Sequence, residues 1–330
     1  MKKKIISLGL ILGVLVSFSG CGSKDLEDNK GERLRVGVTI NPLKDFAEAI
    51  GGDKVEVFSI IPDGSDAHSF DPKPKDLSDL MNTDVFIYNG LGMEEWIDSV
   101  LGTIEGKDVK VVEASQGINA INISDEDDDN HSDEDHDHEE HADEEHADEE
   151  HEEDHDHDHA HGGKDPHTWL SLNDAIIEAE NIKNSFVEID AENKDYYEEN
   201  FKNLKEQFTD LYDEYVNKFK DLNNKDFVTG HAAFGYLCRD FGLTQKSIAD
   251  VFGEGELTAK NLEALINYSK ENGVKVIFSE SSASEKEAET LAKEVGAKVV
   301  KVYSLETKED NKSYIEGMKY NLETIYNSLK

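Results

Sequence analysis

Three histidines and one glutamate have the residue types of a zinc site. His68, His167 and His231 are the histidines outside a long His- and acid-rich segment, and we expect each to lie where a strand has ended. Glu280 ends a further predicted strand, Val-Ile-Phe-Ser-Glu. In parallel α/β sheets, ligands bind outside the carboxyl ends of the strands. Three imidazoles and a carboxylate suit tetrahedral Zn²⁺, so we predict that folding assembles these four side chains around zinc, although water could replace Glu280 as fourth ligand.

The segment 125–161 separates the first of these histidines from the second. Its 37 positions hold 22 acidic residues and 10 histidines, without Lys or Arg. Because it has no large apolar side chain, it cannot offset the entropy of ordering, and we expect a disordered loop. We interpret it as a weak, multi-site metal collector, with a solubilising acidic spacer as the alternative. The auxiliary metal-binding residues would be His131, His136, His138, His141, His146, His151, His155, His157, His159 and His161.

The net charge of the chain is −40, from 34 basic and 74 acidic residues. This balance excludes a nucleic-acid partner, because phosphate binding needs Lys and Arg, and argues against docking on anionic lipid. The His- and acid-rich segment alone contributes −22, which leaves −18 for the other positions. The acidity is therefore concentrated in one loop and points to divalent cations.

The N-terminal residues resemble a lipoprotein export signal. Three lysines precede an apolar run over 5–18, and Ser-Gly-Cys follows at 19–21. We predict a signal peptide over 1–20, lipidation of Cys21 and a flexible tether over 21–33; an ordinary signal peptide with an incidental cysteine is the alternative. The mature protein would then lie outside the cytoplasmic membrane, anchored to it through Cys21. Cys238 would be a buried free thiol.

Strands and helices alternate on both sides of the loop, which indicates parallel α/β architecture. The predicted strands are 34–40, 55–61, 84–88, 109–113, 226–229, 274–279 and 297–303. The predicted helices are 43–50, 75–81, 93–101, 174–189, 192–220, 232–241, 262–272, 283–295 and 314–329. The helix over 192–220 has an apolar stripe at steps of three and four, so we expect it to join two lobes.

The chain is thus predicted to have two α/β lobes, each with a mainly parallel sheet flanked by helices. The N-terminal lobe would span 34–190 and carry the loop over 124–163. The linking helix would occupy 191–222, and the C-terminal lobe 223–330.

Three motifs resemble those of the zinc-binding solute-binding lipoproteins of bacterial ABC transporters. Residues 64–74 are similar to that family's first-ligand motif, Asp165 to Leu170 reads Asp-Pro-His-Thr-Trp-Leu, and Gly230 to Tyr236 contains His-Ala-Ala-Phe-Gly-Tyr. The resemblance extends over 34–330. It departs at Ser171-Leu172, where the family often has Asp-Pro, and at 256–258, which reads Glu-Leu-Thr in place of Glu-Pro-Ser.

The resemblance implies a rigid helix bridging the lobes and a metal site in the cleft between them. It also implies that His68, His167, His231 and Glu280 ligate Zn²⁺, and His231 favours zinc over manganese. Asp165 is a candidate to orient a ligand histidine. The implied function is capture of Zn²⁺ and its delivery to an ABC transporter permease with a cytoplasmic ATPase. We expect a monomer that is not an enzyme.

Two other function classes stay open at this point. Three protein ligands plus water is also a catalytic zinc arrangement, but the chain has no His-Glu-x-x-His motif, which makes a zinc hydrolase the weaker reading. A surface adhesin or zinc-buffering protein without a transport role has the same sequence features as the solute-binding protein.

Overall fold

A computed structural model describes residues 33–123, 163–251, 259–280 and 285–330. The predicted signal peptide, Cys21, the tether as far as residue 32 and the ten loop histidines lie outside these described residues. Arg33–Lys330 form one compact unit, within which two α/β lobes can be distinguished.

The first lobe is built on a parallel four-stranded sheet with the order β2-β1-β3-β4. Its strands are β1 (Leu34–Val38), β2 (Val55–Ser59), β3 (Val85–Tyr88) and β4 (Lys110–Glu113). Both faces of the sheet are buried, as parallel sheets require. Along β3, Val85 and Ile87 belong to one apolar core, whereas Phe86 between them belongs to another.

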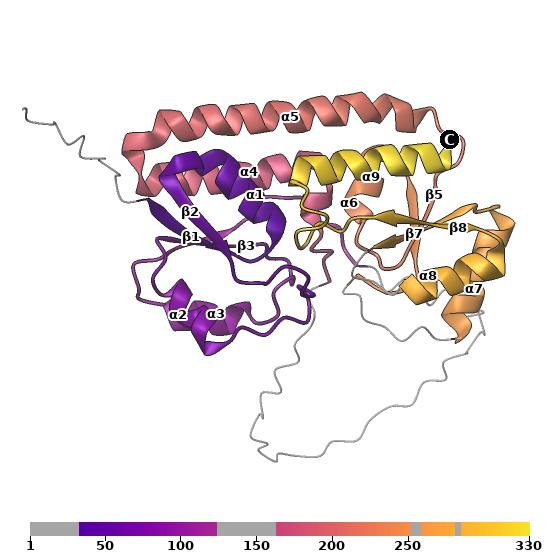
Figure 1. The fold of residues 1–330 in the computed structure, drawn as a ribbon, viewed down its shortest axis with the longest axis horizontal. Coiled ribbons are helices and arrows are strands. Elements are labelled where there is room, and N and C mark those ends of the chain that lie inside the picture. The colour runs from indigo at the N-terminus through magenta and orange to yellow at the C-terminus, as the bar shows by residue number, and fades with distance from the viewer. Residues whose placement is uncertain (1–32, 124–162, 252–258, 281–284) are drawn as a thin grey trace, which may run out of the picture. The chain divides into compact units, whose positions relative to one another are not determined.

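Helices cover both faces of this sheet (Figure 1). They are α1 (Asn41–Gly51), α2 (Pro74–Leu80), α3 (Ile97–Ile104) and α4 (Leu172–Ile189). Leu80 of α2 and Val100 of α3 pack with Phe86 on one face, while α1 and α4 bury their apolar sides on the other. Helix α3 begins at Ile97, later than the predicted residue 93, because Glu94 accepts hydrogen bonds from Asn89 N and Gly90 N and so belongs to a turn before the helix.

The second lobe repeats the same strand order, β6-β5-β7-β8, again parallel. Its strands are β5 (Asp226–Thr229), β6 (Thr244–Ser247), β7 (Val276–Glu280) and β8 (Lys298–Val302). Its helices are α6 (Gly235–Phe241), α7 (Ala259–Glu271), α8 (Glu285–Val295) and α9 (Tyr314–Leu329). The edge strand β6 was not predicted, because Thr-Gln-Lys-Ser contains no apolar residue.

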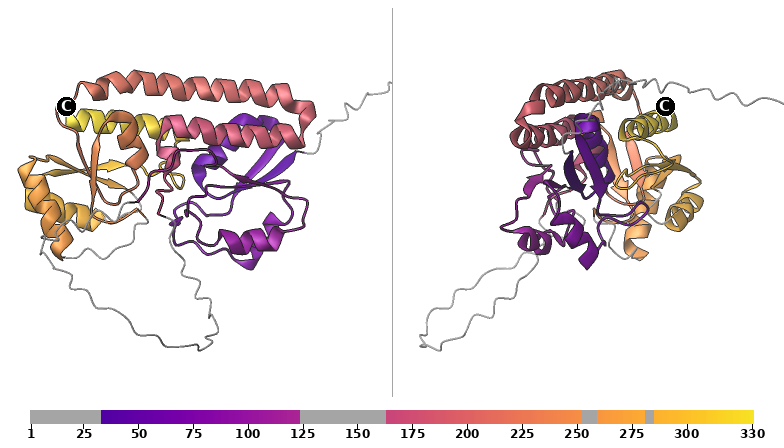
Figure 2. Two further views of the ribbon diagram at one scale, coloured as in Figure 1. Left: turned by 180° about the vertical axis from the view of Figure 1, so that it is seen from behind. Right: turned by 60° about the vertical axis from the view of Figure 1, so that its left-hand side comes forward.

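Helix α5 (Lys194–Lys220) has 27 residues, and at about 1.5 Å per residue it is about 40 Å long. Figures 1 and 2 show it running along both lobes, beside α4 and α9. Its buried stripe consists of Tyr197, Leu204, Phe208, Leu211, Tyr215 and Phe219. The prediction of two parallel α/β lobes joined by a long helix is confirmed.

An aromatic cluster joins the two lobes through this helix. Phe208 of α5 contacts Phe46 of α1 and Tyr314 of α9, with ring centroids 5.5 and 5.2 Å away, and Phe46 and Tyr314 are 4.7 Å apart. These rings belong to one apolar core that includes residues of both sheets. Among the described residues, no helix is both long and apolar enough to cross a membrane.

Candidate metal centre

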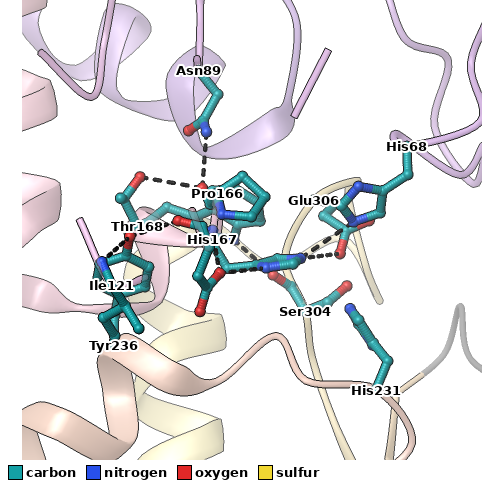
Figure 3. Close-up of polar contacts among 12 residues, drawn as sticks. His68, Asn89, Ile121, Pro166, His167, Thr168, His231, Tyr236, Ser304 and Glu306 are labelled. Atoms are coloured by element: carbon teal, nitrogen blue, oxygen red, sulfur yellow. Dashed lines mark hydrogen bonds and ion pairs between the residues drawn. The ribbon is translucent and has the colours of Figure 1, made fainter. Parts of the chain in front are cut away.

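Three histidines and a glutamate converge between the two lobes (Figure 3). His68 follows β2, His231 follows β5, and Glu306 follows β8. The prediction of a strand end is wrong for His167: among the described residues it follows only the isolated bridge between Asn122 and Lys164, and it precedes the 3-10 turn Thr168–Leu170 that leads into α4. One ligand atom from each of the four side chains lies within 4.8 Å of the others. The lobes therefore contribute two residues each, and neither lobe has the site alone.

The spacing of the ring nitrogens fits a tetrahedral zinc ion. His68 Nε2 and His167 Nε2 are 3.3 Å apart. Two nitrogens at about 2.0–2.1 Å from a tetrahedral Zn²⁺ would be roughly 3.3 Å apart. His167 Nε2 and Glu306 Oε1 are 4.0 Å apart, so a small approach of Glu306 completes the arrangement.

Burial keeps two of the imidazoles neutral. Burial, followed by the nearby His167 and His231, lowers the pKa of His68 to about 3. Burial also lowers the pKa of the fully enclosed His167 well below its usual value, and His231 adds to the effect. Because only neutral imidazole binds metal, both side chains are ready to ligate at neutral pH.

Asp165 determines which nitrogen of His167 faces the site. Its Oδ1 accepts a hydrogen bond from the His167 backbone N–H at 2.9 Å and lies 2.9 Å from His167 Nδ1. A proton on Nδ1 leaves Nε2 as the metal-binding atom. Asn89 Nδ2 donates to Pro166 O and Tyr236 Oη donates to Asp165 O, so the two residues before His167 are held in place.

Glu280 lies behind His231 and outside the group of four. Its Oε1 is 3.8 Å from His231 Nδ1, and the carboxylate is 2% exposed. Neither of its oxygens has a hydrogen-bond partner among the described residues. Burial acts to lower the pKa of His231, but Glu280, Glu306 and Asp165 together raise it.

Glu306 is held by contacts from both lobes. Its carbonyl oxygen accepts a hydrogen bond from Asn41 N at the start of α1, at 2.8 Å. Leu305, directly before it, has φ of 64°, and its N–H donates to Glu309 Oε2 at 3.1 Å. Burial raises the pKa of the Glu306 carboxyl, and its Oε1 has no hydrogen-bond partner among the described residues. An unpartnered, buried acceptor beside three imidazoles has the chemistry of a metal ligand.

The structure thus brings together the three histidines chosen from the sequence and adds a carboxylate that the sequence analysis missed. Glu306 follows the predicted strand 297–303 by three residues, so the strand-end rule that selected Glu280 could also have selected Glu306. Cys238 is a buried free thiol, and burial raises its pKa.

The chain is similar in sequence and in fold to known zinc-binding proteins. The family described as "Zinc-uptake complex component A periplasmic" matches residues 36–328. The chain is 36% identical over 337 residues to the high-affinity zinc uptake system protein ZnuA of Bacillus subtilis (strain 168), which covers 100% of this chain and 99% of the relative.

Two solved structures have similar folds. The laminin-binding protein Lmb of Streptococcus agalactiae, described as a bifunctional protein with adhesin and metal transporting activity, superposes with a TM-score of 0.75 at 30% identity, covering 90% of this chain and 100% of Lmb. The Zn(II)-bound ZnuA-like domain of Streptococcus pneumoniae AdcA superposes with a TM-score of 0.70 at 28% identity, covering 90% and 99%.

Proposed function

The chain belongs to the family of periplasmic zinc-uptake complex component A proteins, and from this premise we propose that it captures Zn²⁺ outside the cytoplasmic membrane and delivers it to an ABC-type permease. The observation that carries the proposal is the group of three buried or half-buried imidazoles and one buried carboxylate from two lobes. Its donor set is that of a zinc site, and the similarity to zinc-uptake proteins gives the same reading.

The proposed ligands are His68, His167, His231 and Glu306. Glu306 replaces Glu280 in this assignment, because Glu306 and not Glu280 belongs to the group of converging ligand atoms. We assign Glu280 to orienting His231 through Nδ1, as carboxylates commonly do for metal-ligating histidines. Four protein ligands fill a tetrahedral zinc ion and leave no position for a reacting water, which supports binding over hydrolysis.

Three further parts of the proposal concern segments outside the described residues, or partner proteins. The lipidated Cys21 would anchor a monomer to the membrane. The ten loop histidines would bind additional zinc weakly and raise its concentration near the central site. The permease and its cytoplasmic ATPase would complete the uptake system.

The ligand assignment is tested by zinc titration against a competing chelator. Trp169 gives a local signal, since its ring centroid is 5.2 Å from that of His167. We expect Glu280→Gln to weaken zinc binding about 10–100-fold, the loss typical of residues that orient metal ligands. We expect Glu306→Gln to weaken it more, because this variant removes a proposed ligand. Glu263→Gln, at an exposed position of α7, serves as the control and should bind like the wild type.

Three outcomes would contradict this proposal. Unchanged tight binding in a variant with His68, His167 and His231 all replaced by Ala would remove the site assignment. A larger loss for Glu280→Gln than for Glu306→Gln would restore Glu280 as the ligand. Deletion of 125–161 without a change in total zinc stoichiometry would remove the collector role of the loop.

A surface adhesin is a second candidate function, and one observation favours it: the similarity to Lmb, which carries both activities. Binding of the zinc-loaded protein to immobilised laminin, compared with zinc-dependent growth of a deletion strain, separates the two roles. Laminin binding without a growth defect would favour adhesion.

A further inference from the structure

A cavity of about 410 Å³ opens beside the metal centre, and its walls come from both lobes. One wall is Gly64, Ser65 and Asp66, in the loop that also carries His68. The other wall is the end of β8 with the turn after it. Glu306 lines this cavity and also belongs to the metal centre. The cavity and the site therefore share one carboxylate.

The cavity is on the side of the metal centre that is open. His167 is fully buried, and His231 and Glu306 are each 4% exposed, whereas His68 is only partly buried. Figure 3 shows Glu306 and His68 next to each other, and their ligand atoms belong to the same 4.8 Å group. Within the described part of the chain, His68 is thus the most exposed of the four, and Glu306 is the one that lines the cavity, so an ion that enters through the cavity meets these two first.

The charges around the cavity suit a cation. Asp66, Glu306, Glu309 and Asp310 line it together with Lys301 and Lys308. Lys301 is paired with Asp310, at 3.5 Å between Nζ and Oδ2. Asp66 accepts hydrogen bonds from His68 N and Ser69 Oγ, neither of which carries a charge. Among the described residues, neither Asp66 nor Glu309 has a lysine or arginine within ion-pair distance. Burial raises the pKa of Glu309 to about 7, so its carboxylate is partly ionised at neutral pH, and an approaching cation favours the charged form.

Glu309 and Glu306 each present an oxygen without a protein partner. Glu309 Oε2 accepts from Leu305 N, but its Oε1 is buried and has no hydrogen-bond partner among the described residues. Glu306 Oε1 is likewise buried without a hydrogen-bond partner among the described residues. A hydrated divalent ion supplies the missing donors through its water molecules, and carboxylates are the hard ligands that can replace those waters one at a time.

We propose that this cavity is the entrance to the metal centre, in which Asp66 and Glu309 attract the hydrated Zn²⁺ and pass it to Glu306 and His68. The inference rests on the proposed function. Negative charge along an entrance raises the association rate of a cation, and the effect decreases with ionic strength. Asp66 and Glu309 therefore control how fast zinc enters, while the four ligands control how long it stays.

The test is stopped-flow mixing of the full-length protein with Zn²⁺ alone at pH 8, above the pKa of Glu309, followed by tryptophan fluorescence at low and high ionic strength. The double variant Asp66→Asn and Glu309→Gln keeps the oxygens that accept from His68 N and Leu305 N but removes both charges. We expect an association rate about 3- to 10-fold lower at low salt, a weaker salt dependence, and an unchanged dissociation rate. Glu263→Gln on α7 removes a remote exposed charge and should associate at the wild-type rate.

The entrance proposal is overturned if the double variant associates as fast as the wild type, if Glu263→Gln slows association equally, or if only dissociation changes. Unfolding curves of all variants establish that each is folded. If the wild type does not bind zinc in the competition titration with a chelator, the proposed function fails; if it binds and the double variant associates at the same rate, only the entrance fails.

Discussion

The three histidines proposed as ligands differ in protonation, although each has to be neutral to bind zinc. His68 and His167 have lowered pKa values because they are buried and lie beside other imidazoles. His231 has a raised pKa, because Glu280, Glu306 and Asp165 together outweigh its burial. His231 is therefore the histidine whose proton zinc has to displace. Its carboxylate neighbours determine the free energy that this deprotonation requires.

We expect zinc affinity to decrease with falling pH from a value above 6.5, the usual pKa of histidine. Below its raised pKa, His231 is mostly protonated, and zinc has to displace that proton in order to bind. Each proton displaced makes Kd rise about tenfold for every unit by which the pH falls. Glu306, whose pKa is also raised, acts in the same direction. Competition titrations between pH 5.5 and 8 measure the pH at which the affinity begins to decrease. Glu280→Gln should move this pH to a lower value. An onset only below 6.5 in the wild type would contradict this electrostatic account.

Among the elements, the turn between β8 and α9 positions Glu306, the carboxylate proposed as a ligand. Leu305 adopts a left-handed backbone conformation there, which costs free energy for a residue with a side chain. Its side chain packs directly over Gly317 of α9, where an added Cβ would lie 2.4 Å from Leu305 Cδ2. The absence of a side chain at Gly317 thus allows the turn that places Glu306.

We predict that Gly317→Ala displaces Leu305 and weakens zinc binding about tenfold, the lower end of what groups that orient metal ligands contribute. The overpacking should also destabilise the protein by about 1–3 kcal/mol. Gly102→Ala in α3 is the matched control, since a Cβ there meets nothing within 4 Å. It should leave Kd unchanged and raise the thermal midpoint slightly. Equal zinc affinities in the two variants would show that Leu305 does not position Glu306.

At the scale of the whole molecule, the lobes are parts of one cooperative core. Phe208 of α5 touches Phe46 from the first lobe and Tyr314 from the second, and all three rings are buried. Three hydrogen bonds reinforce this connection: Trp169 Nε1 to Ser304 O, Tyr314 Oη to Trp169 O, and Asn41 N to Glu306 O. Because the packing crosses from lobe to lobe, opening the site by wide lobe separation would expose apolar surface.

We expect Phe208→Ala to lower the free energy of unfolding of both lobes by about 3–5 kcal/mol, the usual cost of deleting a buried phenyl ring. Hydrogen exchange of backbone amides in β3 and β7 measures the effect in each lobe. Gln207→Ala, the exposed neighbour in the same helix, should change neither. Loss of protection in β3 alone, or in β7 alone, would mean that the lobes unfold independently.

The local pattern of apolar and polar residues was sufficient to predict most of the strands and helices. The apolar alternation predicted seven of the strands near their observed positions, and the spacing of Tyr197 to Phe219 predicted the long helix. It failed at β6, whose polar residues form an edge strand because β5 supplies a partner for their backbone. It also failed at the start of α3, where Glu94 accepts hydrogen bonds from Asn89 N and Gly90 N and so stabilises a turn.

The amino-acid sequence by itself determined the donor types, the concentration of negative charge in one segment and the three histidines outside that segment, two of which follow strands. Only the tertiary structure decided which carboxylate joins them. Glu280 and Glu306 both follow predicted strands of the second lobe, and nothing local separates them. Glu280 ends β7, beside β5, and lies behind His231, whereas the turn at Leu305 carries Glu306 back between the lobes. Metal ligation depends on distances of a few ångströms between residues far apart in the chain, and only the assembled lobes determine those distances.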